Sequence, residues 1–204
     1  MQIRAVRDVK VVLPGDKPDD LPRWERIPRA GEAVTEAVVT GGTWTRATLE
    51  DVSMTRSWLS GADLSAMTLT SARLDRCVLT GCSLVGAHLD AVTLKDVIFE
   101  NCRLDYATLH HLKAAGPVAF IGCSLTETTL SSCTLPTVVF DGCKFAGLTI
   151  EQCDLRGADL RGNDLAGLAC ATALRGTIVS DSQLPALTQL LVNELSIKIK
   201  TGLR

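Results

Sequence analysis

The sequence predicts an all-β solenoid from three observations. An apolar residue recurs every five positions, a small residue stands two positions before it, and a set of glycines is spaced twenty residues apart. Neither an α-helix, with 3.6 residues per turn, nor a strand, with a period of two, keeps a period-five position on one face for more than a turn or two. A chain that coils once every few repeats does, so these patterns favour a solenoid.

The apolar position runs through most of the chain and slips once. It is occupied first by Val34, Val39, Trp44, Leu49, Met54, Leu59, Leu64, Leu69, Leu74, Leu79, Leu84, Leu89, Leu94, Phe99, Leu104 and Leu109. It resumes one residue out of phase at Phe120, Leu125, Leu130, Leu135, Phe140, Phe145, Ile150, Leu155, Leu160 and Leu165. The slip falls near residues 115–117, Ala-Gly-Pro, and predicts a single-residue bulge at a corner of the coil rather than an inserted loop.

Most of the eight cysteines occupy the small position of the repeat. They are Cys77, Cys82, Cys102, Cys123, Cys133, Cys143 and Cys153, and the same position elsewhere holds Ala62, Ala72, Ala87, Ala107 and Ala158. A position that accepts alanine and cysteine alike selects for small volume rather than for sulfur chemistry. With no CxxC pair in the sequence, we expect reduced packing thiols and neither a zinc site nor any other metal site.

The repeat is written most plainly at residues 62–64 and 158–160, Ala-Asp-Leu, and at residues 87–89, Ala-His-Leu. In these triplets the chain resembles the pentapeptide repeat family, whose motif is A(D/N)LXX, and the resemblance covers about two thirds of the sequence. It implies a right-handed quadrilateral β-helix, here of about seven coils, and we expect a C-terminal capping helix after it. Four repeats make one square coil in that family, so residues twenty apart stack at roughly the 4.8 Å strand spacing.

The twenty-residue pitch predicts three columns of stacked residues. One contains Phe99, Phe120 and Phe140, and a second contains Cys82, Cys102, Cys123 and Cys143. The third contains Gly41, Gly61, Gly81, Asn101, Gly122, Gly142 and Gly162. The last set tolerates positive φ, which a corner of the square requires if its turns are left-handed.

The repeat divides the chain into an N-terminal arm, residues 1–31, a β-helix, residues 32–183, and a C-terminal segment, residues 184–204. In the arm we expect one strand over residues 5–13, an extended proline-rich stretch, and Trp24 packed on the first coil. In the C-terminal segment, Asp181 or Ser182 is expected to cap a helix, and Ile197 and Ile199 to lie in a short strand.

The C-terminal helix is expected to close the open end of the solenoid, whose strand edges would otherwise pair further. Its apolar residues, Leu184, Leu187, Leu190, Leu191 and Leu195, recur at helical spacing. The resemblance implies that this end also forms a homodimer, and the candidate dimer residues are Leu187, Leu190, Leu191 and Leu195.

The sequence lacks the motifs of an enzyme. It contains no GxGxxG, P-loop or HExxH, and no recognisable nucleophile, base and orienting group, so we expect no catalytic residue and no cofactor. His88, His110 and His111 fall at outward positions or a corner and are expected to be solvated surface residues. The chain has no apolar run of about 18 residues and no signal-peptide pattern, so we expect a cytoplasmic protein that does not contact a membrane.

The distribution of charge along the chain is the first indication of a function. Residues 32–183 contain 17 acidic and 11 basic residues, a balance of −6, whereas the arm and the C-terminal segment each carry +2. An acidic rod repels nucleic acid, so we expect no direct nucleic-acid binding, and it attracts a protein that normally holds DNA. The resemblance implies such a role, because some bacterial pentapeptide repeat proteins mimic DNA, bind DNA gyrase and confer resistance to quinolones.

The candidate acidic residues are Glu50, Asp90 and Glu151 on one face, and Glu100 and Asp141 on another. Three arginines near the first coils, Arg56, Arg73 and Arg76, interrupt this surface, so an ordinary solvated surface remains an alternative to mimicry.

An outward apolar stripe is the second candidate contact surface. It contains Val38, Trp58, Val78, Ile98, Ala119 and Val139. Exposed apolar patches of this length mark a contact, which is either the N-terminal arm or a partner that binds Trp58, Val78 and Ile98. Two classes of function therefore remain: a topoisomerase-binding DNA mimic, and a general protein-interaction scaffold of unknown partner. A metal-dependent hydrolase built on the tube is a distant third.

Overall fold

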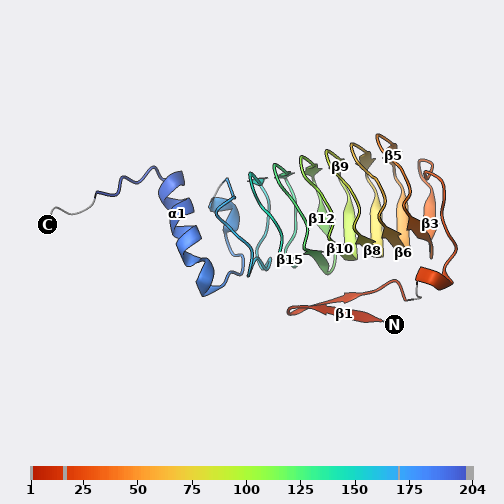
Figure 1. Cartoon of the computed structure of the whole chain (residues 1–204), viewed down its shortest axis with the longest axis horizontal. Coiled ribbons are helices and arrows are strands. Elements are labelled where there is room, and N and C mark those ends of the chain that lie inside the picture. The colour runs from red at the N-terminus through yellow and green to blue at the C-terminus, as the bar shows by residue number, and fades with distance from the viewer. Residues whose placement is uncertain (1, 16–17, 170, 201–204) are drawn as a thin grey trace.

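The computed structural model describes residues 2–15, 18–169 and 171–200. It is a long tube of stacked coils with a β-hairpin along one side and an α-helix at one end (Figure 1). Strands of successive coils pair in parallel about twenty residues apart, as with Leu49 opposite Leu69. The predicted all-β solenoid is therefore confirmed.

The coils form two parallel sheets. The larger sheet contains β3 (Ala33–Thr35), β4 (Val38–Thr40), β6 (Ser53–Ser60), β8 (Arg73–Thr80), β10 (Thr93–Glu100), β12 (Lys113–Ala114), β13 (Val118–Ile121) and β15 (Val138–Asp141). The smaller sheet contains β5 (Thr48–Glu50), β7 (Thr68–Thr70), β9 (His88–Asp90), β11 (Thr108–His110), β14 (Thr129–Ser131) and β16 (Thr149–Glu151). Outside the sheets lie β1 (Ile3–Val6), β2 (Val9–Val12), three 3-10 turns, η1 (Pro18–Asp20), η2 (Thr172–Leu174) and η3 (Asp181–Gln183), and α1 (Leu184–Glu194).

The corners of the coil require left-handed backbone. The predicted glycine column has φ values from 60° to 72°, and Asn101 in the same column has a φ of 52°. Other corners use ordinary residues in the same conformation, such as Ala66 at 54° and Tyr106 at 60°. A left-handed L-residue costs about 1–2 kcal/mol. The interstrand ladder offsets this strain, because Asn101, Ala66 and Tyr106 still donate their backbone N–H groups to the next coil, Tyr106 to the carbonyl of Thr126 at 2.9 Å.

The slip in the repeat is a one-residue bulge, as predicted. Leu94 of β10 pairs with Ala114, and Val97 pairs with Val118, so three steps along one coil oppose four along the next. Gly116 lies in the bulge close to Lys95, where an added Cβ would stand 2.9 Å from the lysine side chain. The bulge therefore absorbs the extra residue without disturbing the coils that follow.

The interior confirms the predicted aromatic and cysteine columns. The rings of Phe99 and Phe120 stack at a centroid distance of 4.7 Å, and those of Phe120 and Phe140 at 5.1 Å. The described cysteines are free, and all but Cys153 are buried. Burial raises the pKa of Cys77 to about 12, so its thiol stays protonated. These cysteines are packing residues; Cys170 lies outside the described part of the chain.

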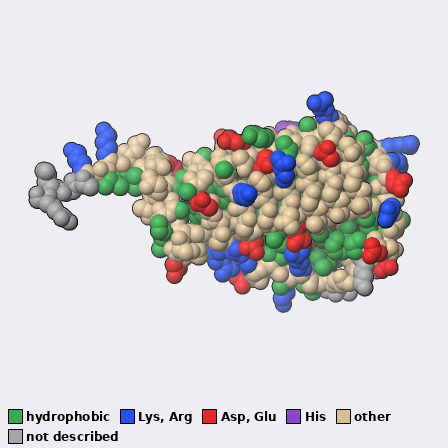
Figure 2. Space-filling model, viewed as in Figure 1, with side chains coloured by type: hydrophobic (Ala, Val, Ile, Leu, Met, Phe, Trp, Pro, Cys, Tyr) green, Lys and Arg blue, Asp and Glu red, His purple; other side chains and the backbone are tan. Residues whose placement is uncertain are grey.

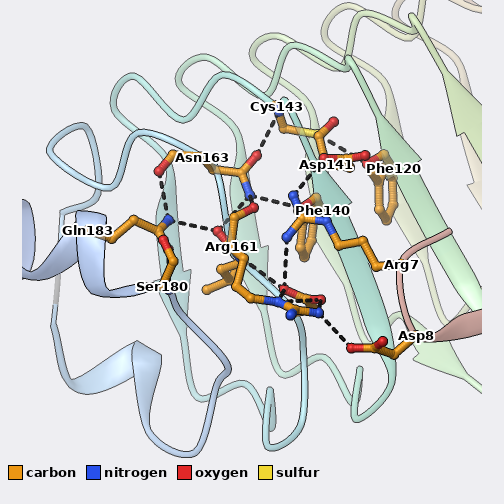
Figure 3. Close-up of polar contacts among 12 residues, drawn as sticks. Arg7, Asp8, Phe120, Phe140, Asp141, Cys143, Arg161, Asn163, Ser180 and Gln183 are labelled. Atoms are coloured by element: carbon orange, nitrogen blue, oxygen red, sulfur yellow. Dashed lines mark hydrogen bonds and ion pairs between the residues drawn. The ribbon is translucent and has the colours of Figure 1, made fainter.

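Two amide side chains continue the cysteine column at the C-terminal end of the tube (Figure 3). The side chain of Asn163 accepts a bond from the N–H of Cys143 at 2.7 Å and donates to the carbonyl of Phe140 at 2.8 Å. In the next coil, Gln183 donates to the carbonyls of Leu160 at 2.8 Å and Asn163 at 2.7 Å. These amides satisfy buried backbone groups where the regular ladder ends.

The C-terminal helix α1 packs against the last coil, with Leu190 buried and Leu187 partly buried against the core. The predicted cap residues, Asp181 and Ser182, do not cap α1; they lie in the 3-10 turn η3, and Gln183 is the N-cap residue of α1. Ser180 precedes a 3-10 turn that leads into α1, and its N–H donates to Gln183 at 2.8 Å. The predicted strand around Ile197 is wrong. Residues 197–200 extend past the helix without forming a strand, because no strand in the described part of the chain pairs with them.

The arm also differs from its prediction. Residues 5–13 are not one strand; β1 and β2 form an antiparallel hairpin in which Val6 pairs with Val9 and Arg7 turns the chain with a φ of 53°. The short turn lets apolar residues of both strands face the tube. The prediction for Trp24 is confirmed: it packs against the core, and its backbone N–H donates to the backbone carbonyl of Val38 at 2.7 Å.

Candidate interaction surfaces

Two outer faces of the tube contain the candidate contact residues. The hairpin face is the outward apolar stripe defined above, on β4, β6, β8, β10, β13 and β15. The open face is the outward side of β5, β7, β9, β11, β14 and β16. The two faces are ten residues apart in a twenty-residue coil, so they lie on opposite sides of the tube, as β1 below and β5 and β9 above show in Figure 1.

The hairpin covers the apolar stripe. Val6 and Val11 of the hairpin form a second hydrophobic cluster with Val78, Ile98, Ala119 and Val139 of the tube, in which each residue is at most 5% exposed. Of the two alternatives for this stripe, coverage by the arm is confirmed. Val78 and Ile98 are buried beneath the hairpin, and Trp58 is partly buried at the margin of the cluster.

Charged contacts also hold the hairpin on the tube, at β10 and at the coils of Asp141 and Asp159. The guanidinium of Arg4 donates two bonds to the carboxylate of Glu100, at 2.8 and 2.6 Å. Arg7 donates to Asp141 at 2.6 Å and to Asp159 at 3.1 Å (Figure 3). Arg4 and Arg7 therefore both bind carboxylates of the tube, and Arg7 connects two successive coils.

Asp159 is the most buried carboxylate of this network, with a side chain only 6% exposed. Arg161 pairs with Asp159 at 2.6 Å and also with Asp8 of the hairpin turn at 2.7 Å. Burial alone raises the pKa of Asp159, but the hydrogen bonds and charges of Arg161 and the charge of Arg7 outweigh it and hold that pKa below its usual range. The hydrogen bond from Arg4 likewise lowers the pKa of Glu100.

Two of the candidate acidic residues, Glu100 and Asp141, are therefore neutralised by the protein's own arm. They share a column, as predicted, because Glu100 pairs with Ile121 and Ile121 with Asp141. Sequence reasoning missed their partners because Arg4 and Arg7 are 96 and 134 residues away along the chain. The one available signal was the net charge of +2 on the arm.

The other three candidate acidic residues remain on the open face. The strand register places Glu50, Thr70, Asp90, His110, Ser131 and Glu151 in one continuous column. Glu50 and Glu151 are exposed and Asp90 is half-buried. Their predicted common face is confirmed, and it runs the length of six paired strands.

The charge on the open face is far lower than that of DNA. Five steps at about 4.8 Å separate Glu50 from Glu151, a length of about 24 Å. Duplex DNA carries one charge per roughly 1.7 Å, or about 14 over this length, against three carboxylates in the column. Many other acidic residues of the tube are paired with a nearby base, namely Glu32, Glu36, Asp75, Asp105 and Asp154. The open face is a moderately acidic surface rather than a full copy of the DNA backbone.

The four candidate dimer residues, three in α1 and Leu195 directly after it, divide into two pairs. Leu187 and Leu190 pack against the last coil, whereas Leu191 and Leu195 are 47% and 65% exposed. Leu184, at 55% exposed, adds to the outward set. The helix therefore caps the tube with one side and presents apolar side chains on the other.

The pentapeptide repeat family model matches eight copies of the repeat, over residues 59–96, 82–114 and 123–162. The chain is a pentapeptide repeat protein. The matched copies begin in β6 and extend past β16, and they include strands of both the hairpin face and the open face. In the part of the chain that the structure describes, this pentapeptide repeat protein has no helix with the length and hydrophobicity of a membrane span.

Solved structures of similar proteins include QnrB1, described as a plasmid-mediated fluoroquinolone resistance protein, at 15% identity and a TM-score of 0.43, covering 88% of this chain and 95% of the other. HetL, involved in heterocyst differentiation regulation in the cyanobacterium Nostoc sp. strain PCC 7120, has 16% identity and a TM-score of 0.32, covering 74% and 84%. Rfr23 from the cyanobacterium Cyanothece 51142 has 15% identity and a TM-score of 0.30, covering 74% and 90%. These likenesses carry no functional argument. No curated protein matches the sequence.

Proposed function

We propose that this pentapeptide repeat protein is a non-enzymatic binding protein that docks a protein partner on its open face. The observation that carries the proposal is the contrast between the two faces. The hairpin buries the apolar stripe on one side, while the opposite ladder keeps Glu50 and Glu151 exposed on a rigid, regularly spaced scaffold. Binding sites held on rigid elements lose little freedom when a partner docks.

DNA gyrase is the specific partner that we propose. The support is the net charge of −6 on residues 32–183 and the pentapeptide repeat itself. Because the open face has about a fifth of the charge density of DNA, we expect it to bind a basic protein groove more weakly than DNA does, with an affinity that falls as salt rises. A general scaffold for another protein is the second candidate, favoured by the arginines that neutralise Glu100 and Asp141.

The decisive assay is supercoiling by purified gyrase, with and without a fluoroquinolone, in the presence of the wild-type protein. A double variant, Glu50→Gln with Glu151→Gln, removes two exposed carboxylates from the open face. At 0.2–1 kcal/mol for each exposed charge, we expect about a fivefold weaker effect on gyrase. The matched control is Asp19→Asn with Asp20→Asn, which removes two exposed carboxylates from η1 in the arm.

The outcomes separate the two candidates. Wild-type protein that changes neither supercoiling nor drug inhibition would exclude gyrase and leave the general scaffold. The open-face proposal itself fails if proteins captured by the wild-type chain are captured equally well by the Glu50 and Glu151 double variant.

We further propose a homodimer through α1, supported by the exposed Leu184, Leu191 and Leu195. Leu191→Glu with Leu195→Glu is expected to convert the dimer to a monomer in sedimentation equilibrium, while the outward-facing substitutions leave the packed Leu190 in place. A wild-type protein that sediments as a monomer at micromolar concentration would contradict this.

A further inference from the structure

Two histidines and a carboxylate meet at the edge of the open face. His110 of β11 pairs directly with Asp90 of β9, and His111 follows at the corner. One ring nitrogen of each histidine and one carboxylate oxygen of Asp90 all lie within 4.8 Å of one another. Histidine side chains are visible in purple at the upper rim of the tube in Figure 2. From the sequence we expected separate solvated histidines. Counting twenty residues back from His110, which reaches Asp90, would have indicated that the carboxylate lies beside the two adjacent histidines.

Hydrogen bonds already orient these side chains. Nδ1 of His111 lies 3.2 Å from Oδ1 of Asp90, and Nδ1 of His110 lies 2.8 Å from the hydroxyl oxygen of Ser131. The two imidazole rings are 3.7 Å apart between centroids. The bond to Ser131 uses one nitrogen of His110 and leaves Nε2 for a ligand, as outer partners of metal-binding histidines commonly do.

We propose that Asp90, His110 and His111 bind a divalent transition metal of the zinc class. Two imidazoles and one carboxylate suit Zn²⁺, whereas Mg²⁺ and Ca²⁺ prefer all-oxygen sites. Zinc bonds of about 2.0–2.2 Å place tetrahedral ligand atoms roughly 3.3 Å apart, so the three groups need to close by about 1 Å or a little more. His111 is exposed and Asp90 and His110 are half-buried, and we expect rotation of these side chains to supply this movement without a shift of the backbone.

The site is accessible and has room for a fourth ligand. The side chain of His111 is 56% exposed and that of Asp90 is 35% exposed, so a metal can enter from solvent and keep water in its remaining position. This binding does not depend on the proposed partner of the open face.

Residues at the equivalent positions of neighbouring coils indicate which substitutions preserve the fold. Thr70 occupies the column of Asp90 and His110, and Ala91 occupies the corner of His111 with a φ of 54°. Asp90→Thr, His110→Thr and His111→Ala therefore introduce residues that a neighbouring coil already accommodates. His88, exposed on the same strand as Asp90 but outside the three-residue group, gives the matched control His88→Ala.

The test is calorimetric titration of Zn²⁺ into the full-length protein without an affinity tag. We expect one equivalent to bind, each of the three substitutions to weaken binding at least tenfold, and Ser131→Ala to weaken it about tenfold through loss of the outer hydrogen bond. His88→Ala is expected to bind as the wild type does, and Mg²⁺ not to bind. A wild-type protein that binds no zinc, or three variants that bind it as tightly as the wild type, would overturn the proposal.

A second measurement guards against binding by cysteine, because Cys153 is partly exposed. With Co²⁺ as the probe, we expect ligand-field bands without a thiolate charge-transfer band, and unchanged binding in Cys153→Ser. A strong thiolate band, or loss of binding in Cys153→Ser, would assign the metal to sulfur and reject the histidine site. Circular dichroism of each variant confirms that the coils are intact.

Discussion

Removal of the Arg7 side chain is expected to release the hairpin from the tube. Arg7 donates to Asp159, whose side chain is 6% exposed, and to Asp141, whose side chain is 43% exposed. A charge-assisted bond to a buried group contributes about 1.5–3 kcal/mol, and the low end applies here because Asp159 keeps Arg161. The half-exposed pair contributes only about 0.2–1 kcal/mol. Arg7→Ala should therefore weaken docking by about 2 kcal/mol, or roughly 30-fold.

Hydrogen exchange measured by mass spectrometry on peptides that cover residues 3–13 tests this number. We expect those amides to exchange roughly 30-fold faster in Arg7→Ala than in the wild type. The control is Arg156→Ala, which also removes a guanidinium bonded to a carboxylate, but that carboxylate is Asp154 of the tube and the arginine side chain is 74% exposed. Exchange that accelerates less than threefold in Arg7→Ala would refute the reasoning, because the apolar cluster alone would then hold the hairpin.

Three further predictions concern stability. Phe120→Ala opens the centre of the aromatic stack and should lower the free energy of unfolding, measured in urea, by about 3–5 kcal/mol. Tyr106 lies at a corner and is 65% exposed, so Tyr106→Ala should change that free energy by less than about 0.5 kcal/mol. Equal effects of the two substitutions would contradict the stacked core. Asn163→Ala leaves the buried N–H of Cys143 without its acceptor and should cost about 1–3 kcal/mol in the same assay, and an unchanged midpoint would show that the amide is not needed. The pKa of Asp159 is lowered in the folded protein, so its stabilisation is complete above its unfolded value of about 3.9 and is lost as pH falls through the lowered value. The difference in melting temperature between wild type and Arg7→Ala should therefore be largest near pH 7 and shrink below about pH 4; a difference that grows in acid would reverse the assignment.

The interior of the tube could be predicted from the sequence, because the five-residue period determines which side chains point inward and which of them stack. The columns of Phe120 and of the cysteines followed from counting twenty residues and allowing for one slip. Corners such as Tyr106 did not follow, because propensity disfavours a left-handed tyrosine and only the interstrand ladder enforces it.

The outer surface was less predictable, because contacts across more than a hundred residues leave no local signal. The strand expected over residues 5–13 became a hairpin, and only the folded register brings Arg7 to Asp141 and Asp159. The acidic residues at Glu50 and Glu151 could be assigned to one face by counting, but their availability depends on where the hairpin docks.

The division into a closed face and an open face is tested most directly by carbodiimide footprinting of carboxylates, read residue by residue by mass spectrometry. The structure predicts rapid modification of Glu50 and Glu151, and slow modification of Asp159 and Glu100, whose side chains are 6% and 24% exposed. Arg7→Ala should accelerate modification of Asp159 without changing Glu50. Modification of Asp159 and Glu100 in the wild type as fast as that of Glu50 would contradict a docked hairpin and with it the assignment of the open face.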